Sequence, residues 1–248
     1  MKLTQALSAL ALAVVVSVGA APAARAADDT IRVATDATFP PLEFVKDGKR
    51  TGFDIDLIDA LAKVMGKKVE WVDIDFKGLI PGLIANRFDV AASGIYMTEE
   101  RRKVVDFTDP YYKGGLVVLV RKDDTSIKTP ADLDGKRVTV QVGTKSVGFL
   151  KDNFPKVQRV EVEKNQEMFD LVNIGRADAA VTGRPAAVQY AKVQPNVRVL
   201  DRALTTELYG FALRKDEAAL TAQMNKALQT LRANGTYDAL VTKWFGKQ

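Results

Sequence analysis

Short apolar runs alternate with longer amphipathic stretches through the first part of the chain. Residues 31–36 alternate towards a strand, and residues 90–92 form a continuous apolar run that is typical of a buried strand. An apolar stripe at helical spacing lies between them, and Gly66 is placed to end that helix. The order of strands and helices predicts a mostly parallel sheet with helices on both faces. The predicted strands are 31–36, 68–74 and 89–93, and the predicted helices are 52–66 and 79–87.

The pattern is interrupted at residues 109–115 and then begins again, which indicates a second lobe. The second series has predicted strands at 116–121, 137–142, 158–163, 178–183 and 197–201, and helices at 165–175 and 185–193. A returning strand at 208–215 precedes amphipathic helices at 217–234 and 236–245. We therefore predict two α/β lobes joined by a two-strand hinge. The first lobe comprises 27–111 plus 209–248, the second 112–208, and the crossings lie near 111–115 and 206–210.

The stretch from Ser93 to Tyr112 holds the clearest candidate for ligand chemistry. Thr98 followed by two glutamates predicts a helix start, with Arg101 as the third helical residue. Because Val104 and Val105 lie three and four positions further on, we expect Arg101 on the inward face. Two interpretations stay open for an inward guanidinium. It is suited to gripping a carboxylate with two parallel bonds, and it is equally suited to a structural salt bridge.

The first 26 residues read as a secretory signal: a basic residue, an apolar stretch, and then Ala24-Arg25-Ala26 before a cleavage site. Removing them leaves 222 of 248 residues and lowers the formal charge from +5 to +3, since they carry Lys2, Arg25 and no acid. Charges of both signs are interspersed elsewhere, which argues against a nucleic-acid partner. No later apolar stretch reaches the roughly 18 residues of a membrane span, so we expect an exported, soluble chain.

The chain contains no histidine and no cysteine. This excludes a Ser-His triad, a cysteine nucleophile, disulfides and the usual zinc sites. The side-chain types that remain suit ligand recognition better than catalysis. We expect no cofactor and no metal. Residues 143–146 superficially match a phosphate loop, but Thr144 and Thr139 stand where that motif needs glycines. The loop could still offer hydroxyl and N–H groups to a small ligand at a helix start.

Several long motifs occur in register: VATDATFPPLEF, TGFDIDLIDALA, DFKGLIPGL, DVAASGIYMTEERRKVVDFTDPYY, LDGKRVTVQVGTKS, GRADAAV and LRANGTYDALVTKWFG. With them, residues 28–248 resemble the polar amino acid solute-binding proteins of bacterial ABC transporters, with glutamine-binding and lysine/arginine/ornithine-binding proteins nearest in pattern. The resemblance implies a type II periplasmic binding protein fold whose lobes close over one small molecule. It also implies a periplasmic location, a permease partner in the inner membrane and a monomer.

The resemblance further implies a set of ligand-binding positions. Arg101 would bind the ligand carboxylate together with Ser93 and the N–H of Gly94. The rings of Phe39 and Phe76 would pack on either side of the ligand's carbon chain. Asp36 would meet the polar end of the ligand's side chain, and the second lobe would reach in at Gln141 and Thr144. Tyr111 and Tyr209 would lie near the hinge strands. The complete predicted set is Asp36, Phe39, Phe76, Ser93, Gly94, Tyr96, Arg101, Gln141, Thr144 and Gly183.

Two positions depart from the family pattern, both at the α-amino-acid end of the pocket. Gly183 stands where an aspartate usually takes the ligand's ammonium, and Tyr96 stands where a small hydroxyl residue is common. An unpaired buried ammonium would cost several kcal/mol. Either Glu207 or water substitutes, or the ligand is not an ordinary α-amino acid.

Two alternative functions stay open. A periplasmic enzyme on the same scaffold, similar to a cyclohexadienyl or arogenate dehydratase, would need a general acid in the cleft, for which Glu207 is the one candidate. A sensor lobe detached from any transporter would need a separate signalling partner. The transport receptor is the interpretation that the resemblance favours.

Overall fold

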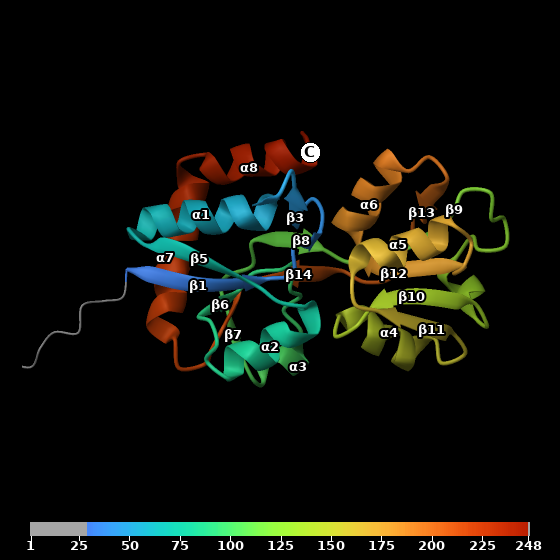
Figure 1. Ribbon diagram of the computed structural model, residues 1–248, viewed down its shortest axis with the longest axis horizontal. Coiled ribbons are helices and arrows are strands. Elements are labelled where there is room, and N and C mark those ends of the chain that lie inside the picture. The colour runs from blue at the N-terminus through green and yellow to red at the C-terminus, as the bar shows by residue number, and fades with distance from the viewer. Residues whose placement is uncertain (1–28, 248) are drawn as a thin grey trace, which may run out of the picture.

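The computed structural model describes residues 29–247, so the predicted signal segment at 1–26 lies outside the described residues. Two lobes lie side by side along the longest axis of the molecule (Figure 1). The predicted two-lobed α/β fold is confirmed, with a five-stranded sheet and flanking helices in each lobe. Within residues 29–247, every helix is too short or too polar to span a lipid bilayer.

The first lobe is built on a sheet with the strand order β5-β1-β6-β15-β7. Its strands are β1 (Thr30–Thr35), β5 (Lys68–Asp73), β6 (Val90–Ala91), β7 (Asp106–Phe107) and β15 (Ala212–Leu213). Helices α1 (Phe53–Met65) and α8 (Thr236–Phe245) cover one face, and α2 (Phe76–Ile84) and α3 (Glu99–Arg102) cover the other (Figure 1). Helix α7 (Ala218–Ala233) packs against α1. A small antiparallel sheet follows β1 and consists of β2 (Thr38–Phe39), β3 (Glu43–Lys46) and β4 (Lys49–Thr51).

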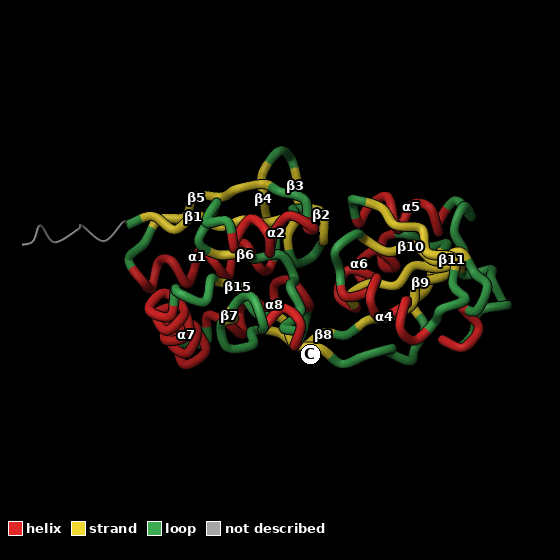
Figure 2. Tube along the Cα trace, turned by 90° about the horizontal axis from the view of Figure 1, so that it is seen from below, coloured by secondary structure: helices red, strands yellow, loops and turns green. Residues whose placement is uncertain are grey.

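The second lobe has the strand order β11-β10-β12-β9-β13. Its strands are β9 (Leu116–Arg121), β10 (Arg137–Gln141), β11 (Gln158–Val162), β12 (Ala179–Gly183) and β13 (Val197–Val199). Its helices are α4 (Lys145–Asn153), α5 (Asn165–Asn173), α6 (Arg184–Val193) and the 3-10 turn η1 (Pro130–Leu133). The strands β8 (Tyr112–Gly114) and β14 (Glu207–Tyr209) pair antiparallel between the lobes. The C-terminal end of the chain lies beside them (Figure 2), where Phe245 stacks on Tyr112.

Each sheet contains one strand that runs against the other four, β15 in the first lobe and β9 in the second. These are the strands that the chain enters directly after crossing between the lobes. The parallel strands β1, β6, β10 and β12 end at the edge that faces the other lobe, so a strand that starts there must run the opposite way. The carboxyl ends of four parallel strands therefore converge on one place, as in other open α/β sheets that bind ligands.

Three predicted elements differ from the observed ones. Helix α2 begins at Phe76 rather than at residue 79, so the predicted loop 76–78 forms its first turn. The loop predicted at 143–146 instead opens helix α4, whose sequence is too polar to show a clear apolar stripe. The single strand predicted at 208–215 is broken into β14 and β15 at Gly210, where a Cβ atom would lie 2.8 Å from Met97 Sδ.

Two acidic side chains, Glu43 and Asp54, are fully buried beneath the edge of the first lobe that faces the second. Asp54 accepts hydrogen bonds from the Gly94 N–H at 2.9 Å and the Tyr111 hydroxyl at 2.7 Å. Glu43 accepts one from the Ser93 hydroxyl at 3.0 Å. Burial raises the pKa of Glu43 well above its usual range, and burial raises the pKa of Asp54 to about 7. The pair therefore holds a proton near neutral pH and fixes the backbone at Ser93 and Gly94.

This raised pKa predicts a pH-dependent stability. Between about pH 4 and pH 7 the folded chain holds a proton at Asp54 that the unfolded chain has lost, so this group's contribution to the free energy of unfolding falls as pH rises through that window. Asp54→Asn removes the titration while keeping both acceptor contacts. We expect the free energy of unfolding of the variant, relative to wild type, to increase by roughly 2–4 kcal/mol from pH 4 to pH 8. Urea denaturation across that range measures it.

The matched control is Asp47→Asn, which removes the same charge from an exposed turn between β3 and β4. The difference in free energy of unfolding between Asp47→Asn and wild type should not change with pH in the way expected for Asp54→Asn. A stability difference for Asp54→Asn that stays constant from pH 4 to pH 8 would contradict the raised pKa.

Candidate functional site

The facing strand ends of the two lobes enclose one cavity, and the sequence-predicted positions converge on it. All ten of them line its wall: Asp36, Phe39, Phe76, Ser93, Gly94, Tyr96, Arg101, Gln141, Thr144 and Gly183. The cavity volume is about 30 Å³, which is room for two or three water molecules.

Arg101 reaches the cavity from helix α3. The predicted N-cap is present, since Thr98 Oγ1 accepts from the Arg101 N–H, but the helix ends at Arg102 and Val104 is half exposed. Val105 is fully buried and its N–H donates to the carbonyl of Arg101 at 2.9 Å, so the apolar stripe that predicted an inward Arg101 is present at Val105 and absent at Val104. The guanidinium is held by the carbonyl of Tyr96 at 3.0 Å and by the carbonyl of Gly143, in the second lobe, at 3.2 Å.

Among residues 29–247 no carboxylate forms an ion pair with Arg101, so the structural salt bridge is not formed. The guanidinium lies over the ring of Phe76, with its Cζ 5.5 Å from the ring centroid. Burial lowers the pKa of Arg101 to about 10. A desolvated cation that keeps further N–H donors is a strong site for an anion.

Asp36, at the end of β1, already has four hydrogen-bond donors. The Thr38 hydroxyl and the Lys164 ammonium each lie 3.1 Å from Oδ1. The Phe76 N–H and the Gln141 amide lie 3.2 Å and 2.8 Å from Oδ2. A carboxylate has about four lone-pair positions, so Asp36 has no acceptor position left in this arrangement.

Ser93 and Gly94, at the end of β6, line the cavity, but their donors are directed elsewhere. The Ser93 hydroxyl donates to Glu43 at 3.0 Å, and the Gly94 N–H donates to Asp54 at 2.9 Å. The family resemblance implied that both donors would face a ligand carboxylate. The structure differs because two buried carboxyl groups, Glu43 and Asp54, lie directly behind this backbone and were not predicted.

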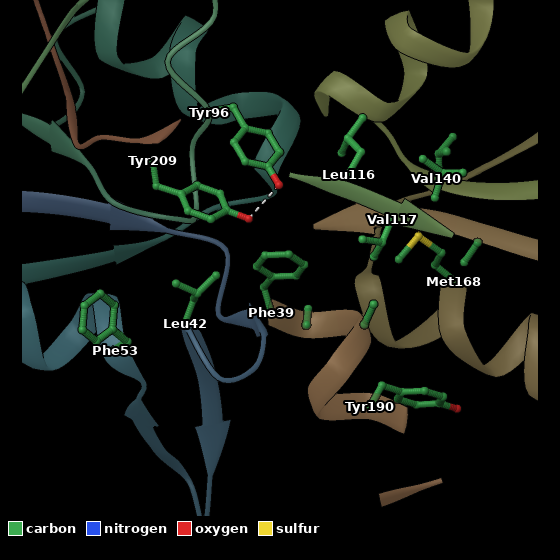
Figure 3. Close-up of a cluster of buried hydrophobic side chains, with 14 of the residues drawn as sticks. Phe39, Leu42, Phe53, Tyr96, Leu116, Val117, Val140, Met168, Tyr190 and Tyr209 are labelled. Carbon is green, nitrogen blue, oxygen red and sulfur yellow. Dashed lines mark hydrogen bonds between the residues drawn. The ribbon is translucent and has the colours of Figure 1, made fainter. Parts of the chain in front are cut away.

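Tyr96 and Tyr209 fill the part of the site next to Gly183. Their rings stack at 4.4 Å, and the Tyr209 hydroxyl donates to the Tyr96 hydroxyl at 2.9 Å (Figure 3). A Cβ atom at position 183 would lie 2.6 Å from Tyr209 Oη, 3.1 Å from Tyr96 Oη and 3.0 Å from the tip of Phe39. The two departures from the family pattern are therefore one feature, because the phenol groups occupy the space that an aspartate at position 183 would need.

The second lobe closes the cavity with β10 and the start of α4. The Gln141 amide donates to the carbonyl of Glu163 at 3.0 Å as well as to Asp36. Thr144 is the N-cap residue of α4, and its hydroxyl donates to the carbonyl of Gln141 at 2.7 Å. Lys145 and Ser146, the first helical residues, line the cavity, so the positive end of the helix dipole faces the same space as Arg101.

Several functional neighbours were not predicted. Glu43 and Asn165 line the cavity, and Lys164 stands at its rim, where it bonds Asp36 and, at 2.6 Å, Asp75. Lys164 is 128 residues from Asp36, so no local motif links them. Glu207, suggested as a substitute ammonium partner, is instead paired with Lys145 at 2.5 Å.

The chain is similar to known proteins along most of its length. The family model of the bacterial extracellular solute-binding proteins, family 3, matches residues 31–247. The ABC transporter arginine-binding protein 1 of Escherichia coli (strain K12) is 35% identical over 225 residues, which cover 88% of this chain and 92% of that protein.

Two solved structures extend the comparison. An ancestral arginine-binding protein bound to arginine is 42% identical, with a TM-score of 0.85 over 88% of this chain and 99% of its own. An ancestral amino acid-binding protein, described as a precursor of cyclohexadienyl dehydratase, is 45% identical, with a TM-score of 0.83 over 88% of this chain and 96% of its own. The chain belongs to the bacterial extracellular solute-binding proteins, family 3.

Proposed function

We propose that this protein is an exported receptor that captures a small polar amino acid or related carboxylate between its lobes and delivers it to an ABC importer. The observation that carries the proposal is the guanidinium of Arg101, which lies in the cavity between the lobes without a carboxylate partner among the described residues. Related proteins are named as binders of arginine, histidine and cystine. A ligand carboxylate is the natural partner for such a cation.

Closure of the lobes would be the signal that the importer reads. The two strands β8 and β14 form the crossing, so the first lobe of 27–111 plus 209–248 would turn against the second lobe of 112–208. Contacts already cross the gap at Arg101 to Gly143, Gln141 to Asp36, and Lys77 to Glu163 at 2.5 Å. A ligand that touches both lobes adds to these contacts and shifts the equilibrium towards the closed form.

The location and partners follow from the same proposal. The segment at 1–26 would direct export to the periplasm, and the closed form would dock, as a monomer, on a permease in the inner membrane. Binding suits the site better than catalysis, because Glu207, the one general acid considered, is paired with Lys145. Relatives named as ABC transporter components favour the transport role over a detached sensor.

A thermal-shift panel of amino acids, amines and small carboxylates tests the receptor role. A ligand present at about a thousand times its dissociation constant should add roughly 4 kcal/mol to the free energy of unfolding. For a chain of this size, that raises the melting temperature by roughly 10 °C. If no polar small molecule on the panel moves the melting temperature, the receptor role is rejected.

Arg101→Ala should abolish binding of any acid that the panel identifies while leaving the protein folded. Two charge-assisted hydrogen bonds are lost, so we expect a drop in affinity of about 100-fold or more in isothermal titration. Arg102→Ala is the matched control, because Arg102 is the next residue of α3 but points to the ring of Phe107. Equal losses in the two variants would show that Arg101 acts only through the local structure.

A further inference from the structure

We propose that the cavity selects a small carboxylic acid that carries no cationic group, such as a 2-oxo or 2-hydroxy acid, in preference to the matching α-amino acid. The inference rests on the proposed receptor function and narrows its ligand class. The charges and the hydrogen bonds of the side chains that line the cavity support this preference.

Four ionisable acidic or basic side chains line the cavity: Asp36, Glu43, Arg101 and Lys145. Asp36 is paired with Lys164 at 3.1 Å, a lysine that also pairs with Asp75 at 2.6 Å, and Lys145 is paired with Glu207 at 2.5 Å. Glu43 is fully buried, and burial raises its pKa well above the usual range, so it is a neutral acid. Among the described residues that line the cavity, Arg101 is the charged side chain that forms no ion pair, and a ligand carboxylate would neutralise it.

The α-amino end of the site offers a donor rather than an anionic acceptor. Gly183 has no side chain, and the hydroxyls of Tyr209 and Tyr96 fill the space beside it. The Tyr96 oxygen accepts hydrogen bonds from the Gly115 N–H at 3.2 Å and from the Tyr209 hydroxyl at 2.9 Å. Its own O–H is left to donate, and burial raises the pKa of Tyr96 to about 12, so the proton stays in place. A carbonyl or hydroxyl oxygen accepts such a proton, whereas an ammonium cannot.

The opposite end of the site is closed to a basic ligand side chain for a different reason. Asp36 is the anion that would meet a guanidinium or ammonium there, but its four acceptor positions are taken by Thr38, Phe76, Gln141 and Lys164. Lys164 is already the cation at this carboxylate. A basic ligand would have to displace it, which a neutral side chain need not do.

The test compares matched pairs of ligands on the wild-type protein by isothermal titration. The pairs are L-leucine with 4-methyl-2-oxopentanoate, L-methionine with 4-methylthio-2-oxobutanoate, L-phenylalanine with phenylpyruvate, and L-glutamate with 2-oxoglutarate. We expect the oxo acid to bind at least tenfold more tightly than its amino acid in every pair that binds. L-arginine and glycine betaine, which carry cationic groups, should bind more weakly than the best oxo acid.

Each other outcome has a definite meaning. Tighter binding of an amino acid, of L-arginine or of glycine betaine overturns this inference and leaves the receptor function standing. If no member of any pair binds, and no compound of the wider panel raises the melting temperature, both the receptor function and this inference are rejected.

A variant that restores the family's aspartate should reverse the preference. Gly183→Asp combined with Tyr209→Phe adds the carboxylate and removes the hydroxyl that lies 2.6 Å from the new Cβ position. We expect the ratio of oxo-acid affinity to amino-acid affinity to fall at least 100-fold, with folding checked by thermal denaturation. A folded variant that keeps the wild-type ratio contradicts the role given to position 183. If the variant does not fold, the wild-type comparison still decides.

Lys164→Met tests the opposite end independently. It removes the cation and one of the two donors at Asp36 Oδ1, and we expect the affinity for L-arginine to rise at least tenfold over wild type. Lys77→Met is the matched control, because Lys77 also pairs across the lobes but with Glu163 rather than Asp36. No gain in the Lys164 variant, or an equal gain in the control, contradicts the role assigned to Lys164.

Discussion

The structure depends on one desolvated cation held at the meeting point of two sheets. Arg101 is kept in place by two carbonyl groups, one from each lobe, and by the face of Phe76. Neutral acceptors offset part of the cost of burying a charge, but they leave that charge in the cavity. In the proposed receptor, an anion in the cavity would supply the counter-charge that the protein does not, and closure and binding would then be parts of one equilibrium.

Two buried carboxyl groups support the backbone at the end of β6, beside this cation. Glu43 and Asp54 take the hydroxyl of Ser93 and the N–H of Gly94, and Asp54 also binds the Tyr111 hydroxyl beside the crossing strands. The pair therefore links the floor of the site to the segment on which the lobes would turn. The pKa values of both carboxyl groups are raised because the groups are buried in the core. A proton held by the pair lowers the free-energy cost of burying them.

The lobes could be predicted from local patterns, because apolar runs and stripes locate the strands and helices. The list of cavity residues came from the family resemblance, which implied that Asp36, Ser93 and Gly183 contribute to one site. The direction of each hydrogen bond could not be predicted, since it depends on partners distant in the sequence. Lys164 lies 128 residues from Asp36, and its contact adds an ion pair to the three hydrogen bonds that Asp36 accepts from Thr38, Phe76 and Gln141.

Contacts across the cavity divide into two kinds with different consequences for recognition. The pair of Lys77 with Glu163 and the bond from Arg101 to Gly143 stabilise closure whatever the ligand is, so they change all affinities by the same factor. The groups at Gly183 and Asp36 touch the regions where ligands differ, so they change ratios of affinities. A receptor can therefore keep the family's closing motion while changing its ligand class through a few side chains. Gly183 and Tyr96 would be such a change if this chain is the proposed receptor, because a hydroxyl donor stands where the family pattern implies an anionic acceptor.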